Sequence, residues 1–341
     1  SARSGMFRFT YPESDDAFIL LDMDHTLWWK CRWANLRLED DHTLSGYKLV
    51  QGWGPERHVY FTAEFSVPIS DFGIMQSGKR VCYDTSRFRS DREAWGEDLK
   101  FWVRFATREE EQVTVRVAIS SVDPDGARGN LRETDGLSFD EIRRRGEELW
   151  ETELSRFTVE GPARTKETFY TSAYRCFLSP FLFQDADGRF LEHDQSIGRA
   201  EGFTNYTTFS LWDTYRAEHP FLNLFFPHRN ADMVRSMIAH CDQSVHHMLP
   251  VWSHMGNENW CMSGYHAVSV LADAVAAGNF THVRTALDAM LSTSTVPYYE
   301  GVADYMRLGY VPLERSATAA STTLEYSYDD WAIYRTALDA G

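Results

Sequence analysis

The spacing of the hydrophobic residues changes along the chain, and this change constrains the fold more than any other feature. Every second position is apolar in residues 113–119 and again in residues 101–105. A two-residue period is typical of half-buried antiparallel strands. Further strand-like runs occupy residues 7–11, 17–21, 59–65 and 72–74, with turn residues between them. We therefore expect an all-β domain, a sandwich, over residues 1–122.

The second half of the chain has a helical period instead. Apolar residues between 169 and 177 recur at the spacing of one helix face. Similar patterns predict helices near residues 230–245, 262–277, 281–291 and 322–340. This half is therefore predicted to be all-helical, with aromatic loops between the helices.

The segment between the two halves has the features of a linker. Asp123 to Asn130 is rich in turn residues, and Ser138 with Glu141 fits a capping box that starts a connecting helix. The predicted organisation is a β-sandwich domain at 1–122, a linker with a helix at 123–157, and a helical domain at 158–341.

The charge balance limits the classes of partner. The 341 residues include 50 acidic and 34 basic side chains, for a formal net charge of −16. A surface this negative argues against nucleic acid and anionic membranes as partners. No run of 18 apolar residues could span a membrane, and no signal peptide is visible from Ser1 onward. The five cysteines form no CxxC pair, so neither a zinc ribbon nor a redox pair is expected; they are Cys31, Cys82, Cys176, Cys241 and Cys261.

The stretch from Ser210 to Arg216 combines an aromatic ring, a carboxylate and a guanidinium group. The face of Trp212 suits the apolar C–H face of a sugar ring. Asp213 can accept two hydroxyl protons, and Arg216 can orient that carboxylate or donate to a ligand. The same residues also fit a buried helix start with a satisfied Asp–Arg pair, so the pattern alone leaves both interpretations open.

Two other acidic motifs have ordinary structural explanations. An apolar strand leads into Asp22-Met-Asp24-His-Thr26, which resembles the DxDxT motif of haloacid dehalogenase-type phosphatases. That fold needs a helix after the strand, whereas strand-like sequence follows here, so hairpin capping is the preferred interpretation. Asp185 to Gly188 resembles the start of a calcium loop but lacks the acidic residue at the twelfth position, which favours an Asp/Gly turn.

The order of motifs along the chain resembles glycoside hydrolase family 92, the calcium-dependent exo-α-mannosidases. The most specific segment is Phe209–Arg216 followed by His219-Pro220. The other matching segments are Gly52-Trp53, Gly129–Leu131, Phe169–Arg175, Asp185–Gly188, Leu249–Trp252, Met262–His266, Asp273-Ala274, Gly309–Pro312 and Thr323–Trp331. The resemblance covers essentially the whole chain.

The resemblance implies a multi-domain β + α protein, an antiparallel β-sandwich followed by an (α/α)6 barrel. It implies removal of terminal α-linked mannose, with α-1,2 linkages preferred, by inversion and with Ca²⁺ as cofactor. The expected partners are mannose-terminated glycans such as N-glycans, and the expected location is extracellular or periplasmic. Inversion requires a carboxylic acid and a carboxylate about 6.5–9.5 Å apart.

The sequence also departs from the family pattern. An (α/α)6 barrel has twelve helices, and only five or six are predicted here. The family motifs His-Gly-Asn-Glu-Pro and Gly-Asn-Asp-Asp-Cys-Gly-Gln, which carry the acid, the base and most calcium ligands, do not occur. We therefore expect a partial barrel, no metal ligands in these residues, and the remaining portion of the same enzyme as a partner. The alternative is a non-catalytic glycan-binding relic.

By resemblance, Trp212 and Asp213 are expected to contact the terminal mannose, and Arg216 either contacts it or supports Asp213. Glu258 is a weak candidate for a general acid, with Trp260 raising its pKa by desolvation, but substrate contact or helix capping is preferred. His266 is expected to contact the sugar or to lie in the core. Asp329 and Asp330 point about 100° apart on a helix, so at most one can face a site.

Overall fold

The computed structural model describes residues 1–27, 29–84, 86 and 90–341, which form two compact units. The first comprises Ser1–Tyr170 with Gln184–Arg189, and the second comprises Thr171–Phe183 with Phe190–Gly341. No helix in the described part of the chain is long and apolar enough to cross a membrane.

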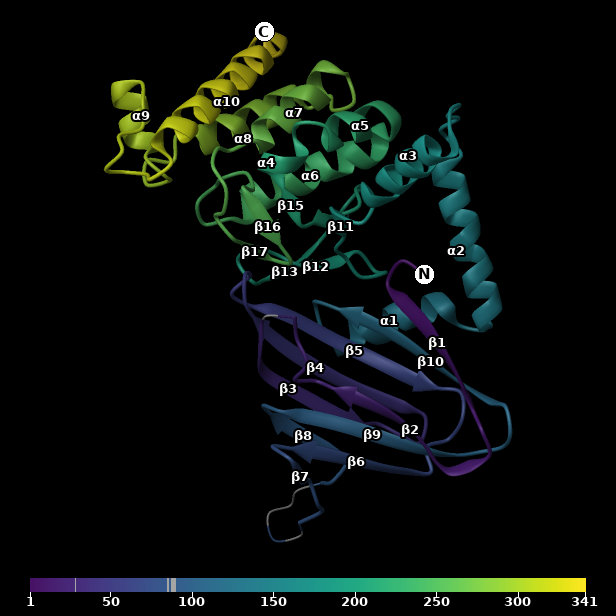
Figure 1. Ribbon diagram of the computed structural model, residues 1–341. Coiled ribbons are helices and arrows are strands. Elements are labelled where there is room, and N and C mark those ends of the chain that lie inside the picture. The colour runs from purple at the N-terminus through teal and green to yellow at the C-terminus, as the bar shows by residue number, and fades with distance from the viewer. Residues whose placement is uncertain (28, 85, 87–89) are drawn as a thin grey trace. The chain divides into compact units, whose positions relative to one another are not determined.

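The first unit contains two antiparallel sheets (Figure 1). Its strands are β1 (Ser4–Tyr11), β2 (Ser14–Asp22), β3 (Lys30–Leu38), β4 (Thr43–Gln51), β5 (Arg57–Phe65), β6 (Asp71–Gln76), β7 (Lys79–Arg80), β8 (Glu93–Gly96), β9 (Leu99–Thr107) and β10 (Glu111–Ser120). Among the described residues, one sheet has the order β1-β10-β5-β4-β3-β8 and the other β2-β9-β6-β7. The expected antiparallel, strand-rich first domain is confirmed.

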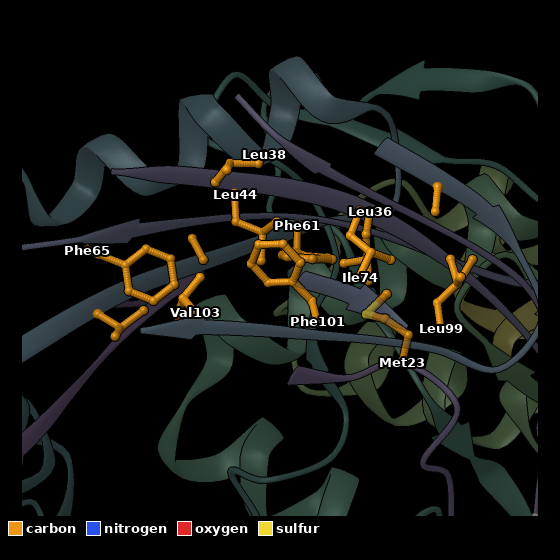
Figure 2. Packing of buried hydrophobic residues seen from close by; sticks show 14 of the residues in the cluster. Met23, Leu36, Leu38, Leu44, Phe61, Phe65, Ile74, Leu99, Phe101 and Val103 are labelled. Atoms are coloured by element: carbon orange, nitrogen blue, oxygen red, sulfur yellow. The ribbon is translucent and has the colours of Figure 1, made fainter. Parts of the chain in front are cut away.

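One hydrophobic core joins the two sheets. Alternate residues of β9 are buried, as the two-residue period predicted, whereas β4 and β5 bury consecutive residues. Figure 2 shows the core residues, with Leu36, Leu44 and Phe61 from the first sheet and Ile74, Phe101 and Val103 from the second. These side chains are at most 8% exposed. Burial of both inner faces makes the pair of sheets a sandwich.

The DxDxT segment forms a turn that leads into another strand. The carboxylate of Asp22 at the end of β2 accepts hydrogen bonds from the backbone amides of Asp24 and His25. The next described element is β3, not a helix. The strand–helix context that a phosphatase of this type needs is therefore absent from the described residues, and the capping interpretation fits the contacts.

Helices α1 (Pro124–Leu131) and α2 (Phe139–Leu154) follow the sheets, with a short 3-10 turn at Arg132–Thr134 between them. The predicted capping box is present, because the Ser138 side chain accepts from the Glu141 amide and Glu141 accepts from Ser138. α2 buries no residue, as expected for a polar connecting helix. Helix α3 (Ala163–Arg175) starts the helical half of the chain.

A buried turn anchors α1 within the first unit. The carboxylate of Asp185 accepts hydrogen bonds from Ser120 Oγ at 2.7 Å and Asn130 Nδ2 at 2.8 Å, and burial raises its pKa. Asp187 pairs with Arg189. Both acidic residues of the calcium-like motif are thus engaged in protein contacts, as expected of an Asp/Gly turn.

We expect Gly126→Ala to destabilise the first unit by about 1–3 kcal/mol, because an added Cβ overpacks this turn. The new atom would collide with the Asp185 carboxylate and lie 2.6 Å from Ser120 Oγ. Gly129→Ala in the same helix is the matched control, since nothing lies within 4 Å of its Cβ. Urea unfolding followed by circular dichroism compares them, and equal stabilities would contradict the anchoring role.

The second unit is mainly helical. Its helices are α4 (Leu211–Thr214), α5 (Glu218–Phe225), α6 (Pro227–Gln243), α7 (Ala267–Ala276), α8 (Val283–Ser294), α9 (Val302–Leu308) and α10 (Ala319–Ala340). Short strands between them are β11 (Phe181–Leu182), β12 (Arg189–Leu191), β13 (Ile197–Arg199), β14 (Tyr206–Thr207), β15 (Phe209–Ser210), β16 (Trp252–His254) and β17 (Asn257–Glu258). α10 packs against α7 and α8, and α5 packs against α6 (Figure 1). A helical second domain is confirmed, but the prediction that this half is all-helical was wrong, because short strands β11–β17 lie between its helices.

Candidate functional site

The Ser210–Arg216 stretch lies where a short strand turns into a helix. β15 pairs with β16, and α4 begins at the next residue. Phe209 and Leu211 are almost fully buried and fix this turn in the core of the unit. Trp212 is half-buried, while Asp213 is exposed. Adjacent residues of α4 therefore carry a half-buried aromatic ring and an exposed carboxylate.

The Asp213–Arg216 pair that the sequence left open as one interpretation is not formed among the described residues. Asp213 instead accepts a hydrogen bond from Ser210 Oγ at 2.6 Å. Arg216 lies over the rings of Trp212 and Tyr215, and its guanidinium is 3.7 Å from a carboxylate oxygen of Glu325. Asp213 makes no ion pair with the described residues, which leaves its carboxylate accessible to a ligand.

Glu325 on α10 fixes the orientation of the indole. Trp212 Nε1 donates to Glu325 Oε1 at 3.0 Å, and the Glu325 side chain is only 17% exposed. A buried indole N–H needs such a partner. No local pattern in the sequence points to Glu325, because 113 residues separate it from Trp212. Its only signal was its place within the family-like segment Thr323–Trp331.

His266 lies behind Glu325 rather than at the surface. Its ring is buried, stacks on Tyr215 at 4.3 Å, and has its Nδ1 2.8 Å from Asp329 Oδ1. Its Nε2 lies 3.2 Å from Glu325 Oε2, although the geometry is not that of a hydrogen bond. These contacts fit the interpretation that His266 lies in the core. His266 could then influence a bound sugar only through Glu325.

The adjacent carboxylates of α10 have different partners. Asp329 is fully buried and also accepts from the Tyr265 amide at 2.8 Å. Burial raises the pKa of Asp329, while the hydrogen bond from His266 opposes this. Asp330 is exposed and accepts from the hydroxyls of Tyr265 and Tyr305. All of these are contacts within the helical unit, and Asp329, being fully buried, is not open to a ligand.

Glu258 has the contacts of a structural carboxylate. Its two oxygens accept from the backbone amides of Val251, Trp252, Asn259 and Trp260 at 2.8–3.0 Å. Burial raises its pKa, and these four hydrogen bonds lower it. The geometry therefore favours a structural role, in which Glu258 holds the loop backbone, over acid catalysis. A substrate contact by Glu258 stays a prediction.

No calcium ligand set can be assigned in the described part of the chain. Among those residues, no group of three or more His, Cys, Asp or Glu side chains is arranged to hold a metal ion. Glu325, on the far side of the indole, is already paired with Trp212 and lies 3.7 Å from the Arg216 guanidinium.

Glu218, at the start of α5, gives the helical unit a pH-dependent stability. Burial raises the pKa of Glu218 to about 7. Because this folded-state pKa exceeds the unfolded value, the stabilising contribution is full below about pH 4.5 and is lost as the pH rises through 7. We expect Glu218→Gln to be more stable than the unchanged chain by about 1–3 kcal/mol at pH 8 but not at pH 4.5.

Denaturant unfolding at a series of pH values measures this difference in unfolding free energy. Glu201→Gln, at an exposed position of the same unit, is the control for the loss of one carboxylate. A difference between Glu218→Gln and the unchanged chain that stays constant with pH would exclude a raised pKa at Glu218.

Comparison with known protein families matches both halves of the chain. Residues 1–120 match the glycosyl hydrolase family 92 N-terminal domain, and residues 126–341 match the family 92 catalytic domain. A search of curated proteins finds no match.

Three solved structures are similar over nearly the whole chain. The family GH92 α-mannosidase BT3965 from Bacteroides thetaiotaomicron, in complex with mannoimidazole, is 55% identical in sequence with a TM-score of 0.97. The match covers 100% of this chain and 45% of the α-mannosidase chain. The family GH92 inverting mannosidase BT2199 from Bacteroides thetaiotaomicron VPI-5482 is 26% identical with a TM-score of 0.87, covering 99% and 46%. The family GH92 glycosyl hydrolase ccman5, at 23% identity and a TM-score of 0.81, covers 100% and 44% and shows the fold alone.

This chain therefore spans a little under half the length of the solved proteins that it resembles. The two domain matches together cover nearly every residue, and the first structure is more than half identical in sequence. The resemblance found in the motifs is confirmed, and the chain belongs to glycosyl hydrolase family 92.

Proposed function

We propose that this chain is part of an α-mannosidase that removes terminal α-linked, preferably α-1,2-linked, mannose. The observation that carries the proposal is the exposed Asp213 carboxylate beside an indole whose orientation Glu325 fixes. The C–H face of the mannose ring would stack on Trp212, and the Asp213 carboxylate would accept hydrogen bonds from two hydroxyls of the sugar. The similar solved structures support this reading, since their names describe α-mannosidases and one holds mannoimidazole.

Within this scheme, the described residues bind and orient the sugar. An inverting mechanism needs an acid that protonates the leaving oxygen and a base that activates water, about 6.5–9.5 Å apart. Asp213 is placed to bind hydroxyls, and Glu258 is occupied by four backbone amides. We therefore propose that the acid and the base lie outside these 341 residues, in the remaining portion of the same enzyme.

Calcium dependence and location belong to the same proposal. We propose Ca²⁺ as the cofactor on the basis of the family resemblance, with its ligands also outside these residues. The proposed substrates are mannose-terminated glycans such as N-glycans, and the proposed location of the protein is extracellular or periplasmic. The negative charge of the chain suits such neutral substrates.

Incubation with α-1,2-mannobiose tests this proposal. A protein that contains this chain together with the remaining portion should release mannose, lose activity in EDTA, and give the inverted anomer in a proton NMR time course. Release of mannose by these 341 residues alone would contradict the assignment of the catalytic pair elsewhere. Sugar binding without turnover in the longer protein would favour the glycan-binding relic instead.

A further inference from the structure

A cavity in the helical unit shares no residue with the Trp212 site. It has a volume of about 330 Å³, at the lower end of the roughly 300–1,000 Å³ of small-molecule sites. Trp260, Tyr298, Tyr299, His246 and Glu300 line it. Two of these aromatic side chains stay open to solvent, with Trp260 42% exposed and Tyr298 68% exposed.

The loop that carries Trp260 is held in an unfavourable backbone shape. Met255, Trp260 and Met262 all adopt positive φ angles of 50°, 51° and 68°. For residues other than glycine this conformation costs on the order of 1–3 kcal/mol each and persists only where the surroundings enforce it. At Trp260 the Glu258 carboxylate holds the loop, because it accepts from the amides of Asn259 and Trp260 as well as from those of Val251 and Trp252. The strained loop presents an indole to solvent instead of burying it.

The other walls of the cavity are also fixed. The Trp260 ring lies 5.2 Å from His246 in an edge-on arrangement and 5.7 Å from Tyr299. The Tyr298 hydroxyl is 3.0 Å from His246 Nδ1, and the Tyr299 hydroxyl donates to the Gly264 carbonyl. Glu300 is held by a hydrogen bond from Ser316 Oγ at 3.2 Å. The cavity is therefore largely preorganised for a ligand.

We propose that this cavity binds a neutral pyranose ring of a glycan as a second sugar site, separate from Trp212 and Asp213. The indole offers a stacking face, and His246, Tyr298 and Glu300 surround it with donors and acceptors that a ring bearing several hydroxyls can use. A trimethylammonium group could use the aromatic rings and the charge of Glu300 but has no N–H or O–H with which to bond His246 and Tyr298. The inference rests on the proposed function, because it takes the ligand of both sites to be a mannoside.

Calorimetric titration with α-1,2-mannobiose tests the second site. The unchanged chain should show two binding events. Trp260→Asn should lose one of them and keep the other, since asparagine tolerates a positive φ and strain alone would not explain the loss. Glu300→Gln, which preserves the side-chain shape, should weaken the same event at least fivefold. Trp95→Ala removes an exposed indole of the sandwich unit and should leave both events unchanged.

The outcomes separate this inference from the proposed function. If Trp260→Asn and Glu300→Gln bind like the unchanged chain while Asp213→Asn loses binding, the second site is wrong and the Trp212 site stands. If Asp213→Asn is unchanged and Trp260→Asn removes all binding, the cavity is a sugar site and the assignment of Trp212 and Asp213 fails. Binding of choline in place of the sugar, or no sugar binding by the unchanged chain, would overturn the inference.

Discussion

Asp213→Asn is expected to weaken binding of mannoimidazole to this chain about 10- to 100-fold. The carboxylate is exposed, has no cationic partner among the described residues, and is steadied by Ser210. Hydrogen bonds from sugar hydroxyls to a charged acceptor contribute about 1.5–3 kcal/mol in total, which corresponds to that loss of affinity. An amide keeps the shape of the side chain but removes the charge and one acceptor.

Isothermal titration calorimetry measures this loss directly. Asp242→Asn, an exposed aspartate of α6, is the matched control because it makes the same chemical change away from Trp212. Thermal melting should show both variants folded, as surface substitutions change stability little. Equal affinities for Asp213→Asn and the unchanged chain would remove Asp213 from the proposed sugar site.

Asp329→Ala is expected to destabilise the helical unit by about 3–5 kcal/mol. Asp329 is fully buried and accepts hydrogen bonds from His266 Nδ1 and from the Tyr265 amide. Its removal leaves both donors buried without a partner, and it also frees the imidazole that lies against Glu325. Sugar binding should weaken together with stability, because Glu325 holds the indole of Trp212.

The adjacent Asp330→Ala provides the control for this prediction. Asp330 is exposed and accepts only from two tyrosine hydroxyls among the described residues, so its loss should cost about 1 kcal/mol or less. Urea unfolding monitored by circular dichroism at 222 nm gives both values. A loss of similar size in the two variants would show that the Asp329–His266 contact contributes little to stability.

The sequence predicted the division into a strand-rich half and a helical half because hydrophobic periodicity is a local property. Hydrophobic periodicity did not predict one strand or the exact start of one helix. β4 contains Gly46, a residue that weakens a strand pattern, and the structure places the Phe61 ring where a Cβ would otherwise sit. The helix predicted near residue 262 begins only at Ala267, since Met262 and Gly264 adopt positive φ angles. These departures follow from tertiary contacts and strained backbone.

The candidate site was only partly predictable for a similar reason. Trp212 and Asp213 were visible because aromatic and acidic residues adjoin in the sequence and belong to a family motif. The Asp213–Arg216 pair, one of the two interpretations that the pattern left open, does not form among the described residues, since Arg216 stacks on Trp212 and faces Glu325. Glu325 itself comes from a helix more than a hundred residues later. No local spacing could identify that contact without the fold.

A crystal structure of this chain with bound mannoimidazole tests the central claim most directly. We predict the sugar ring over the Trp212 indole, with ring hydroxyls within hydrogen-bond distance, about 2.5–3.0 Å, of the Asp213 carboxylate. An ordered inhibitor that contacts neither Trp212 nor Asp213 would contradict it.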